Sequence, residues 1–291
     1  MATPSMVQPP VDFPFPQSYQ DLVRMQQSNP VKVLKRDDYG YKVVMKLRPG
    51  IVLKHGGEFA DEILCMRVAR AAGLPVPDVL YHPGSVNIRN PWTYPPVKNV
   101  WYFCMEEMPG VSLDTVVDQL SDDKLLSLAS QLRGYLDLLA RVPHQGTIGS
   151  VDGGSFRTLM VSPLYQPERP FQNVAEFNNF LSSLYGQCVV PHAIFIEHTS
   201  CLPTNDTIRF THGDLVPKNI MVDANGERIT GIIDWENAGF YPSYWEYCRM
   251  HDGMAMTPGW EKILNTVFPE PKRQKEIDAV RAMLVTFDIQ L

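Results

Sequence analysis

The sequence has few of the features that mark disulfide-bonded, nucleic-acid-binding or membrane-spanning proteins. Only five of its 291 residues are cysteine, and their scattered spacing predicts reduced thiols in a reducing compartment rather than a disulfide framework. The net charge of −6 includes no run of lysine and arginine, so a nucleic-acid partner is not expected. No apolar run approaches the ~20 residues that cross a bilayer, and the start of the chain lacks a secretory signal. We expect a cytoplasmic protein without a membrane partner, and the oligomeric state is left open.

The remaining composition is that of a globular protein with three segments. Hydrophobic residues make up 44% and charged residues 20% of the chain, which is ordinary for a folded domain with a large core. Residues 1–29 form a proline-rich N-terminal segment. Residues 30–106 are expected to form a first lobe of strands with one main helix, and residues 107–291 a larger lobe that is mostly helical. The predicted fold class is therefore α+β.

The first lobe is predicted from turn signals and alternating apolar residues. After a short helix at 21–28, strands are expected at 31–34, 41–47 and 51–54, with turns at 37–40 and 48–50. A helix is expected over 59–72, where Gly73 ends it. Further strands at 78–81 and 100–105 flank a loop over 85–98. Pro109-Gly110 then marks the end of the lobe.

The second lobe shows helical periodicity. Ser121 is expected to cap a helix whose leucines recur along one face, and a second helix fits 174–185. Asn225-Gly226 lies between the apolar runs 220–222 and 229–233 and predicts a hairpin. Later helices are expected at 243–251, 260–267 and 272–287.

Two short segments carry the chemistry. His212-Gly213-Asp214 is followed by Asn219, and Ile232-Ile233-Asp234-Trp235-Glu236 follows the predicted hairpin. This spacing suits phosphoryl transfer, because Asp214 could accept the proton of a substrate hydroxyl while Asn219 and Asp234 hold Mg²⁺ on nucleotide phosphates. The structural alternatives are a loop Asp bonded to backbone amides, a turn Asn and a helix-capping Asp.

These segments resemble the signature of the aminoglycoside phosphotransferase family, and the run 238–246 is most similar to fungal phosphotransferases of unassigned substrate. The resemblance covers roughly residues 30–255. It implies a bilobal protein-kinase-like fold, with a small antiparallel-sheet N-lobe that binds nucleotide and a larger mostly helical C-lobe. The C-lobe would carry the catalytic loop and the acceptor site.

The resemblance also implies roles for residues outside the two segments. Lys54 would contact the α- and β-phosphates of ATP and be held by Glu62, although Lys42 and Lys46 are alternatives for the lysine and Glu58 for its partner. The adenine would bind near Glu106 and Met108.

Two residues of the motif are expected to support it. His212 would brace the loop by bonding backbone or Asp234. Glu236 would lie near the metal, or contact a cationic acceptor.

Two features depart from the kinase pattern. No Gly-x-Gly-x-x-Gly occurs between the first two strands, where residues 37–40 read Asp-Asp-Tyr-Gly instead, so phosphate contacts from this loop are not implied. Lys218 precedes Asn219, and we expect its side chain to point into solvent rather than to the γ-phosphate.

The predicted function is that of a small-molecule kinase that transfers the ATP γ-phosphate to a hydroxyl acceptor. The alternative is a non-catalytic nucleotide-binding pseudokinase or binding module. A protein kinase is disfavoured, because the segment after Asp234 is too short to dock a peptide. The acceptor region, 111–205 and 240–291, contains acidic residues compatible with an amine-bearing small molecule. These are Glu168, Glu176, Glu197, Asp206, Glu246 and Asp252.

Overall fold

The computed structural model describes residues 21, 24, 32–36, 42–57, 59–82, 102–156, 166–186 and 190–288. The predicted helix at 21–28, the turn at 37–40 and the loop at 85–98 fall largely or wholly outside these residues. The chain divides into two compact units. Unit 1 comprises the described residues within Met1–Ala60, Asp78–Asn87 and Val97–Glu107. Unit 2 comprises those within Asp61–Pro77, Ile88–Pro96 and Met108–Leu291.

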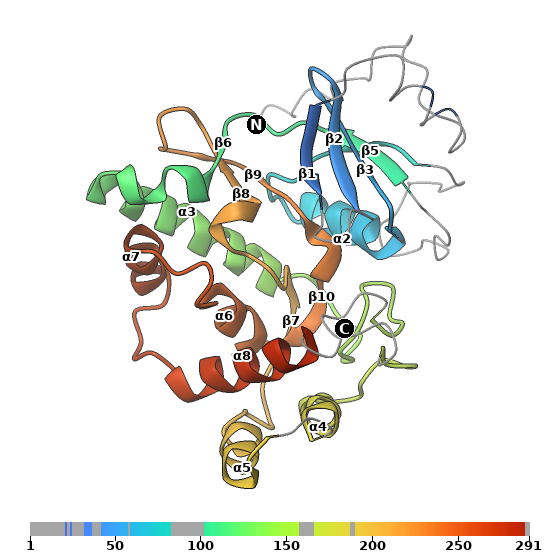
Figure 1. Cartoon of the computed structure of the whole chain (residues 1–291), viewed down its shortest axis with the longest axis vertical. Helices are drawn as coiled ribbons and strands as arrows, with labels where there is room; N and C mark the ends of the chain where they lie inside the picture. Colours follow the sequence, from blue (N-terminus) through green and yellow to red (C-terminus); the bar gives the residue numbers. More distant parts are fainter. Residues whose placement is uncertain are drawn as a thin grey trace. The chain divides into compact units, whose positions relative to one another are not determined.

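Unit 1 is built on a five-stranded antiparallel sheet with the order β1-β2-β3-β5-β4 (Figure 1). Its strands, listed in chain order, are β1 Lys32–Arg36, β2 Val43–Arg48, β3 Ile51–His55, β4 Val79–Tyr81 and β5 Tyr102–Glu106. The three-strand meander predicted for residues 31–54 is confirmed. Alternate residues of the central strands face a small apolar core, which includes Val43, Met45, Leu53 and Cys104.

The β2–β3 turn has a left-handed glycine and an ionic partner. Gly50 adopts φ +84, a conformation that side chains disfavour. The Glu107 carboxylate accepts a 3.0 Å hydrogen bond from the Gly50 N–H and lies 2.6 Å from Nζ of Lys46. This tie fixes the turn to the end of β5.

Helix α2, Ala60–Ala71, ends where the sequence predicted. Gly73 has φ +100 and donates its N–H to the carbonyl of Arg70, which is a common way to end a helix. From Asp61 onward this helix belongs to unit 2, whereas residues 30–106 were expected to form one lobe.

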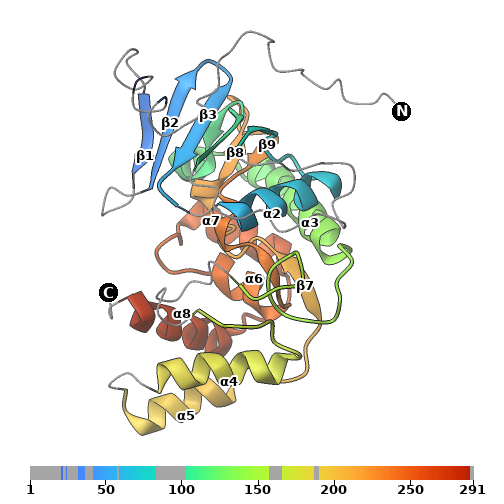
Figure 2. The same cartoon turned by 90° about the vertical axis from the view of Figure 1, so that its right-hand side faces the viewer.

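Unit 2 is mostly helical, as expected. Its helices are α3 Asp122–Ala140, α4 Val174–Tyr185, α5 His192–Ser200, α6 Tyr244–Met250, α7 Pro258–Val267 and α8 Gln274–Asp288. Helix α3 packs against α7, while α4, α5 and α6 contact α8, and both views show α4 and α5 side by side next to it (Figures 1 and 2). Helix α4 has the predicted bounds, and its cap is Asn173, whose side chain accepts the N–H of Glu176.

Five short strands complete unit 2 and carry the motif segments. They are β6 Val111–Ser112, β7 Ile208–Thr211, β8 Ile220–Val222, β9 Ile229–Ile232 and β10 Gly239–Pro242. β8 and β9 form the predicted antiparallel hairpin, and β7 pairs with β10. Gly226 takes φ +67 in the hairpin turn, as the Asn-Gly pair predicted.

One expectation needs correction, and one helix was not predicted. Ser121 is the N-cap residue of α3, but its side chain makes no capping hydrogen bond. Helix α5 was not predicted, because none of its residues is buried and its apolar positions do not follow one face. None of the helices in the described part of the chain is long and apolar enough to cross a membrane.

Candidate active site

The two motif segments flank the β8–β9 hairpin in unit 2 and are joined by hydrogen bonds at its base. Residues 212–216 follow β7, a short 3₁₀ turn at Pro217–Asn219 leads into β8, and the hairpin returns the chain to Ile233. The Ile233 N–H donates to the carbonyl of Asn219 at 2.9 Å, and His212 Nε2 donates to the carbonyl of Ile233 at 3.0 Å. The residue before Asp234 is therefore tied to both ends of the loop that carries Asp214 and Asn219.

The Asp214 carboxylate is held by three donors. Arg249 Nη2 lies 3.0 Å from Oδ1, while Asn219 Nδ2 and Lys218 Nζ lie 2.9 and 3.1 Å from Oδ2. These charge-assisted contacts fix a carboxylate more firmly than neutral hydrogen bonds would. Lys218 does not simply point into solvent as expected, because it pairs with Asp214 although its side chain is 53% exposed.

Asn219 is oriented so that its amide nitrogen makes both of its bonds to Asp214. Nδ2 donates to the Asp214 carbonyl at 2.8 Å and to the Asp214 carboxylate at 2.9 Å. The amide oxygen accepts no hydrogen bond from another described residue and can serve another ligand. Because Mg²⁺ prefers hard oxygen donors and binds through only one or two protein groups plus phosphate oxygens, this oxygen fits the predicted metal role.

Asp234 has an unusual backbone. With φ 68 and ψ 60 it is the one non-glycine residue with positive φ in the described part of the chain. The left-handed conformation costs an L-residue about 1–2 kcal/mol, so neighbouring contacts have to maintain it. Those contacts include the Ile233 bonds and the Trp235 indole N–H, which donates to the Ile232 carbonyl at 2.9 Å. Strain of this kind is often found at functional sites.

The described residues contain no group of three or more His, Cys, Asp and Glu side chains able to hold a metal. The described residues therefore do not form a structural metal centre of that type. An Asp and an Asn suit a metal that arrives with the phosphates of a nucleotide, because the phosphate oxygens complete its ligands.

His212 is a fully buried, neutral ring that braces the loop. Nδ1 can only accept the N–H of Asp214, at 3.2 Å, and Nε2 can only donate to the Ile233 carbonyl. Burial lowers the pKa of His212 below its ordinary value, consistent with this tautomer. The ring also packs on Trp235, with centroids 4.5 Å apart. The backbone bond expected of His212 is present.

Helix α6 supplies two buried ionic side chains that sequence reasoning did not place behind the loop. Glu246 accepts the N–H groups of His212 and Gly213 at 2.6 and 3.2 Å, and burial raises its pKa to about 7. Arg249, one turn further on, reaches Asp214. The sequence held one signal, since Glu246 and Arg249 lie among the aromatic and apolar residues of a single short helix; that helix is buried along its whole length, and ionic residues on it need internal partners.

Glu236 and Glu62 also belong to unit 2. Glu236 lies in the 3₁₀ turn Trp235–Asn237 directly after Asp234 and is half-buried. Glu62 lies in the first turn of α2 and is buried. Met108 follows β5, and its side chain occupies the space beside Gly231, where an added Cβ would come within 2.8 Å of it.

Two predicted nucleotide contacts lie in unit 1. Lys54 is a buried residue of β3, 4% exposed, with its ammonium 5.6 Å from the centre of the Phe59 ring. Glu106 ends β5 and bonds to the Asp78 carbonyl through its N–H at 2.9 Å. Of the alternative lysines, Lys46 is engaged by Glu107. A lysine is rarely buried unless it is paired, and the phosphate contact of Lys54 stays a prediction.

A cavity of about 340 Å³ opens beside Asp214. Carboxylates from Asp114, Asp214 and Asp252 line it with the ammonium of Lys218, and its apolar lining includes Val117 and Met254. Asp114 is exposed and makes no hydrogen bond or ion pair with another described residue. The cavity thus combines the candidate base with an excess of negative charge.

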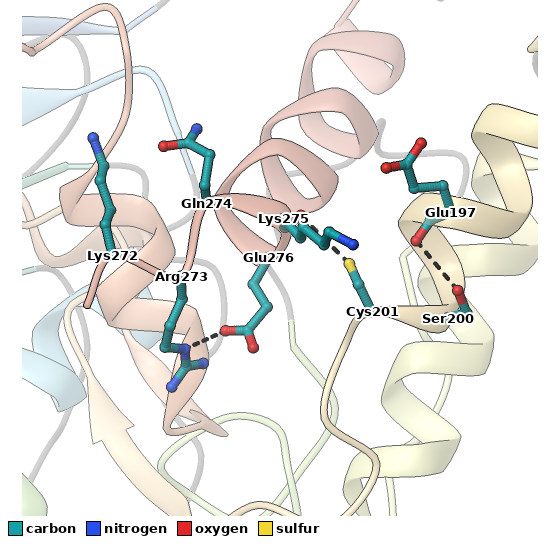
Figure 3. A pocket seen from close by; sticks show the side chains of 8 residues that line it. All are labelled: Glu197, Ser200, Cys201, Lys272, Arg273, Gln274, Lys275 and Glu276. Atoms are coloured by element: carbon teal, nitrogen blue, oxygen red, sulfur yellow. Dashed lines mark hydrogen bonds and ion pairs between the residues drawn. The ribbon is translucent and has the colours of Figure 1, made fainter. Parts of the chain in front are cut away.

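A larger cavity, of about 630 Å³, lies between α5 and the start of α8 (Figure 3). Among its ionic side chains Arg273 pairs with Glu276, whereas Glu197, Lys272 and Lys275 form no ion pair with another described residue. None of the residues predicted for catalysis or nucleotide binding lines it. Size alone therefore does not identify the functional site here.

Comparison with known proteins gives one family and a consistent fold. The phosphotransferase enzyme family matches residues 22–268. Similar solved structures include the GDP complex of aminoglycoside 2'-phosphotransferase-IIIa, which has a TM-score of 0.58 and 16% identity and covers 92% of this chain and 88% of that chain. Another is an aminoglycoside-3'-phosphotransferase of type VIII, with a TM-score of 0.54 and 14% identity, covering 92% of this chain and 98% of that chain.

A third similar structure is a choline/ethanolamine kinase family protein from Mesorhizobium loti. Its TM-score is 0.53 at 15% identity, and it covers 92% of this chain and 84% of that chain. These likenesses confirm the protein-kinase-like α+β fold. The predicted enzyme class, an ATP-dependent phosphotransferase, is confirmed by the family match, and the chain belongs to the phosphotransferase enzyme family.

Proposed function

We propose that this protein is a small-molecule kinase that transfers the γ-phosphate of Mg·ATP to a hydroxyl group, with Asp214 as the catalytic base. The observation that carries the proposal is the triply held Asp214 carboxylate at the edge of a cavity large enough for a small acceptor. A hydroxyl entering that cavity could donate its proton to Asp214 as the new bond to phosphorus forms.

The metal and nucleotide roles follow from the same arrangement. Asn219 and Asp234 would hold Mg²⁺, which neutralises charge on the transferring phosphates when bound. Lys54, with Glu62 as its partner, would contact the α- and β-phosphates, and Glu106 and Met108 would flank the adenine. His212 acts through the loop backbone, and Glu236 would support the metal side of the site. Catalysis in such a site consists mainly of positioning and charge neutralisation.

The acceptor is proposed to be a small hydroxyl compound that also carries an amine. Three carboxylates and one ammonium line the cavity, and Asp114 offers its charge without a partner among the described residues. Val117 and Met254 would contact the carbon skeleton of the acceptor. Aminoglycoside phosphotransferases and a choline/ethanolamine kinase family protein are among the similar structures, and amine-bearing alcohols are a reasonable first panel of acceptors.

A protein substrate fits less well. Only residues 235–243 separate Asp234 from α6, and four of them form β10, which pairs with β7. That segment is therefore committed to the core of unit 2 and has no length left for docking a peptide.

The test is ADP formation from Mg·ATP with a panel of amino alcohols, choline and aminoglycosides, run with wild type and Asp214→Asn. We expect one or more acceptors to raise ADP formation by wild type, and the variant to lose at least about 100-fold in kcat with unchanged affinity for Mg·ATP. ATP should be compared with GTP in the same assay. Nucleotide binding without transfer to any acceptor would instead favour the non-catalytic pseudokinase.

A further inference from the structure

Helix α6 holds the catalytic loop with two side chains one turn apart. The Glu246 carboxylate accepts hydrogen bonds from the backbone N–H groups of His212 and Gly213. Arg249 donates to the Gly213 carbonyl and to the Asp214 carboxylate. Both side chains are buried, at 8% and 6% exposure for the whole residues. Both residues therefore bind the loop from the interior of the protein.

Arg249 uses each of its three nitrogens on a different acceptor. Nε donates to the Gly213 carbonyl at 3.0 Å, Nη2 to Oδ1 of Asp214 at 3.0 Å, and Nη1 to Oδ2 of Asp252 at 3.2 Å. A guanidinium presents its donors in a rigid plane. One rigid group therefore binds both the peptide that precedes Asp214 and the Asp214 carboxylate.

The two oxygens of Asp214 have different surroundings. Oδ1 is occupied by Arg249, whose side chain is 8% exposed, and Oδ2 contacts Lys218, whose side chain is 53% exposed. Oδ2 is therefore the oxygen on the accessible side, next to the cavity that Asp214 and Lys218 both line. Twisting of the carboxylate would break the Arg249 bond to Oδ1 and the Asn219 bond to Oδ2, so Arg249 helps to fix the plane of the carboxylate and the direction of the oxygen on the cavity side.

We propose that Arg249 is a positioning residue that presents Oδ2 of Asp214 to the acceptor hydroxyl, with Asp252 orienting the guanidinium. The proposal rests on the proposed function of Asp214 as base. A buried ion pair contributes little net stability compared with a well-packed apolar side chain, so the Arg249 charge is better explained by its effect on Asp214 than by folding. Arg249 itself does not touch the reacting atoms.

The test measures kcat, the KM for Mg·ATP and thermal stability in Arg249→Met, Arg249→Lys and Arg249→Ala. The reaction followed is ADP release from Mg·ATP with water and with the best acceptor of the amino-alcohol panel. We expect Arg249→Met to lose on the order of 100-fold in kcat while the KM for Mg·ATP changes less than about twofold. Arg249→Lys should recover part of the loss, because it retains a charge without the planar fork.

Two further measurements separate positioning from folding. Methylguanidinium added to Arg249→Ala should restore part of its kcat by occupying the vacated space, which a general folding defect would not allow. Arg273→Met is the matched control, since Arg273 also forms an ion pair within unit 2, with Glu276 (Figure 3), and lines the larger cavity rather than the one beside Asp214. Its kcat should equal that of wild type.

Each outcome bears on one of two claims. A folded Arg249→Met that keeps wild-type kcat would overturn the positioning role and leave the proposed function intact. Absence of turnover in wild type with water and every acceptor would contradict the proposed function itself, and the positioning role with it.

Discussion

The carboxylate of Glu246 accepts a hydrogen bond of 2.6 Å from the backbone N–H of His212, and a second bond of 3.2 Å from that of Gly213. A carboxylate on a buried helix thus holds the backbone of the loop that carries the candidate base. His212 in turn bonds to Ile233 and to the Asp214 N–H. The loop conformation depends on two buried titratable groups whose protonation affects folding in opposite directions.

The first prediction concerns Glu246. Burial raises its pKa to about 7 from 4.5, so the native state binds a proton more tightly than the unfolded chain. Its contribution to stability is complete below pH 4.5 and is lost as the pH rises to about 7, a change on the order of 3 kcal/mol at about 1.4 kcal/mol per pH unit. Glu246→Gln should remove this dependence. Denaturant unfolding at pH 5 and pH 8 measures it, and an identical pH dependence in variant and wild type would contradict the assignment.

The second prediction concerns His212, whose pKa is lowered by burial. Below its unfolded value of 6.5 the unfolded chain takes up a proton that the native state does not, so stability falls as the pH is lowered through this range. The variant Glu246→Gln, with His212 alone, should therefore lose stability at acid pH more steeply than wild type. His212→Gln, in which Glu246 alone remains, should instead gain stability as the pH is lowered from 8 to 5. Equal slopes for both variants would refute the opposed roles.

The third prediction tests the backbone of the loop. Gly213 has φ +80, and an added Cβ would lie 2.4 Å from the Asn237 carbonyl oxygen. Gly213→Ala should therefore cost more than about 1 kcal/mol of stability and lower kcat by about 100-fold, because the adjacent Asp214 must shift. Gly134→Ala is the matched control: this glycine lies inside α3 with no atom near its missing Cβ. It should stabilise the protein by about 0.5–1 kcal/mol and leave kcat unchanged.

The fourth prediction concerns the buried lysine of unit 1. Lys54→Met should raise the KM for Mg·ATP by at least about tenfold, because one charged phosphate contact is worth more than about 1.4 kcal/mol, while unit 1 stays folded. Lys35→Met, an exposed position on β1, provides the comparison and should behave as wild type. If instead Lys46→Met shows the larger effect on KM, the phosphate contact belongs to Lys46.

The sequence predicted those features that depend on local pattern. The Asn225-Gly226 hairpin, the bounds of α4 and the Gly73 stop of α2 follow from turn chemistry or helical periodicity, and each is present. The motif spacing predicted one site for Asp214, Asn219 and Asp234; Asp214 and Asn219 are in contact, and the metal role of Asp234 stays a prediction. Helix α5 was missed because its apolar residues follow no single face, and two of them, Ile194 and Ile196, are exposed.

Features that depend on distant partners could not be predicted in this way. Glu246 appeared in the sequence only as an acidic residue of the acceptor region, yet it faces the loop backbone 33 and 34 positions earlier. The Arg249 contact with Asp214 spans 35 positions. Lys218, expected in solvent, pairs with Asp214 because the 3₁₀ turn brings its ammonium back over the carboxylate.

The left-handed backbone of Asp234 offers the most direct test of the proposed site. Asp234→Gly removes the carboxylate but suits φ 68, so it should fold at least as well as wild type, whereas Asp234→Ala retains the backbone strain. Calorimetric titration with ATP, with and without Mg²⁺, then isolates the metal role. We predict that Mg²⁺ strengthens ATP binding by wild type and has no effect on Asp234→Gly. Equal strengthening by Mg²⁺ in wild type and variant would contradict the proposal that Asp234 holds the metal of a phosphoryl-transfer site.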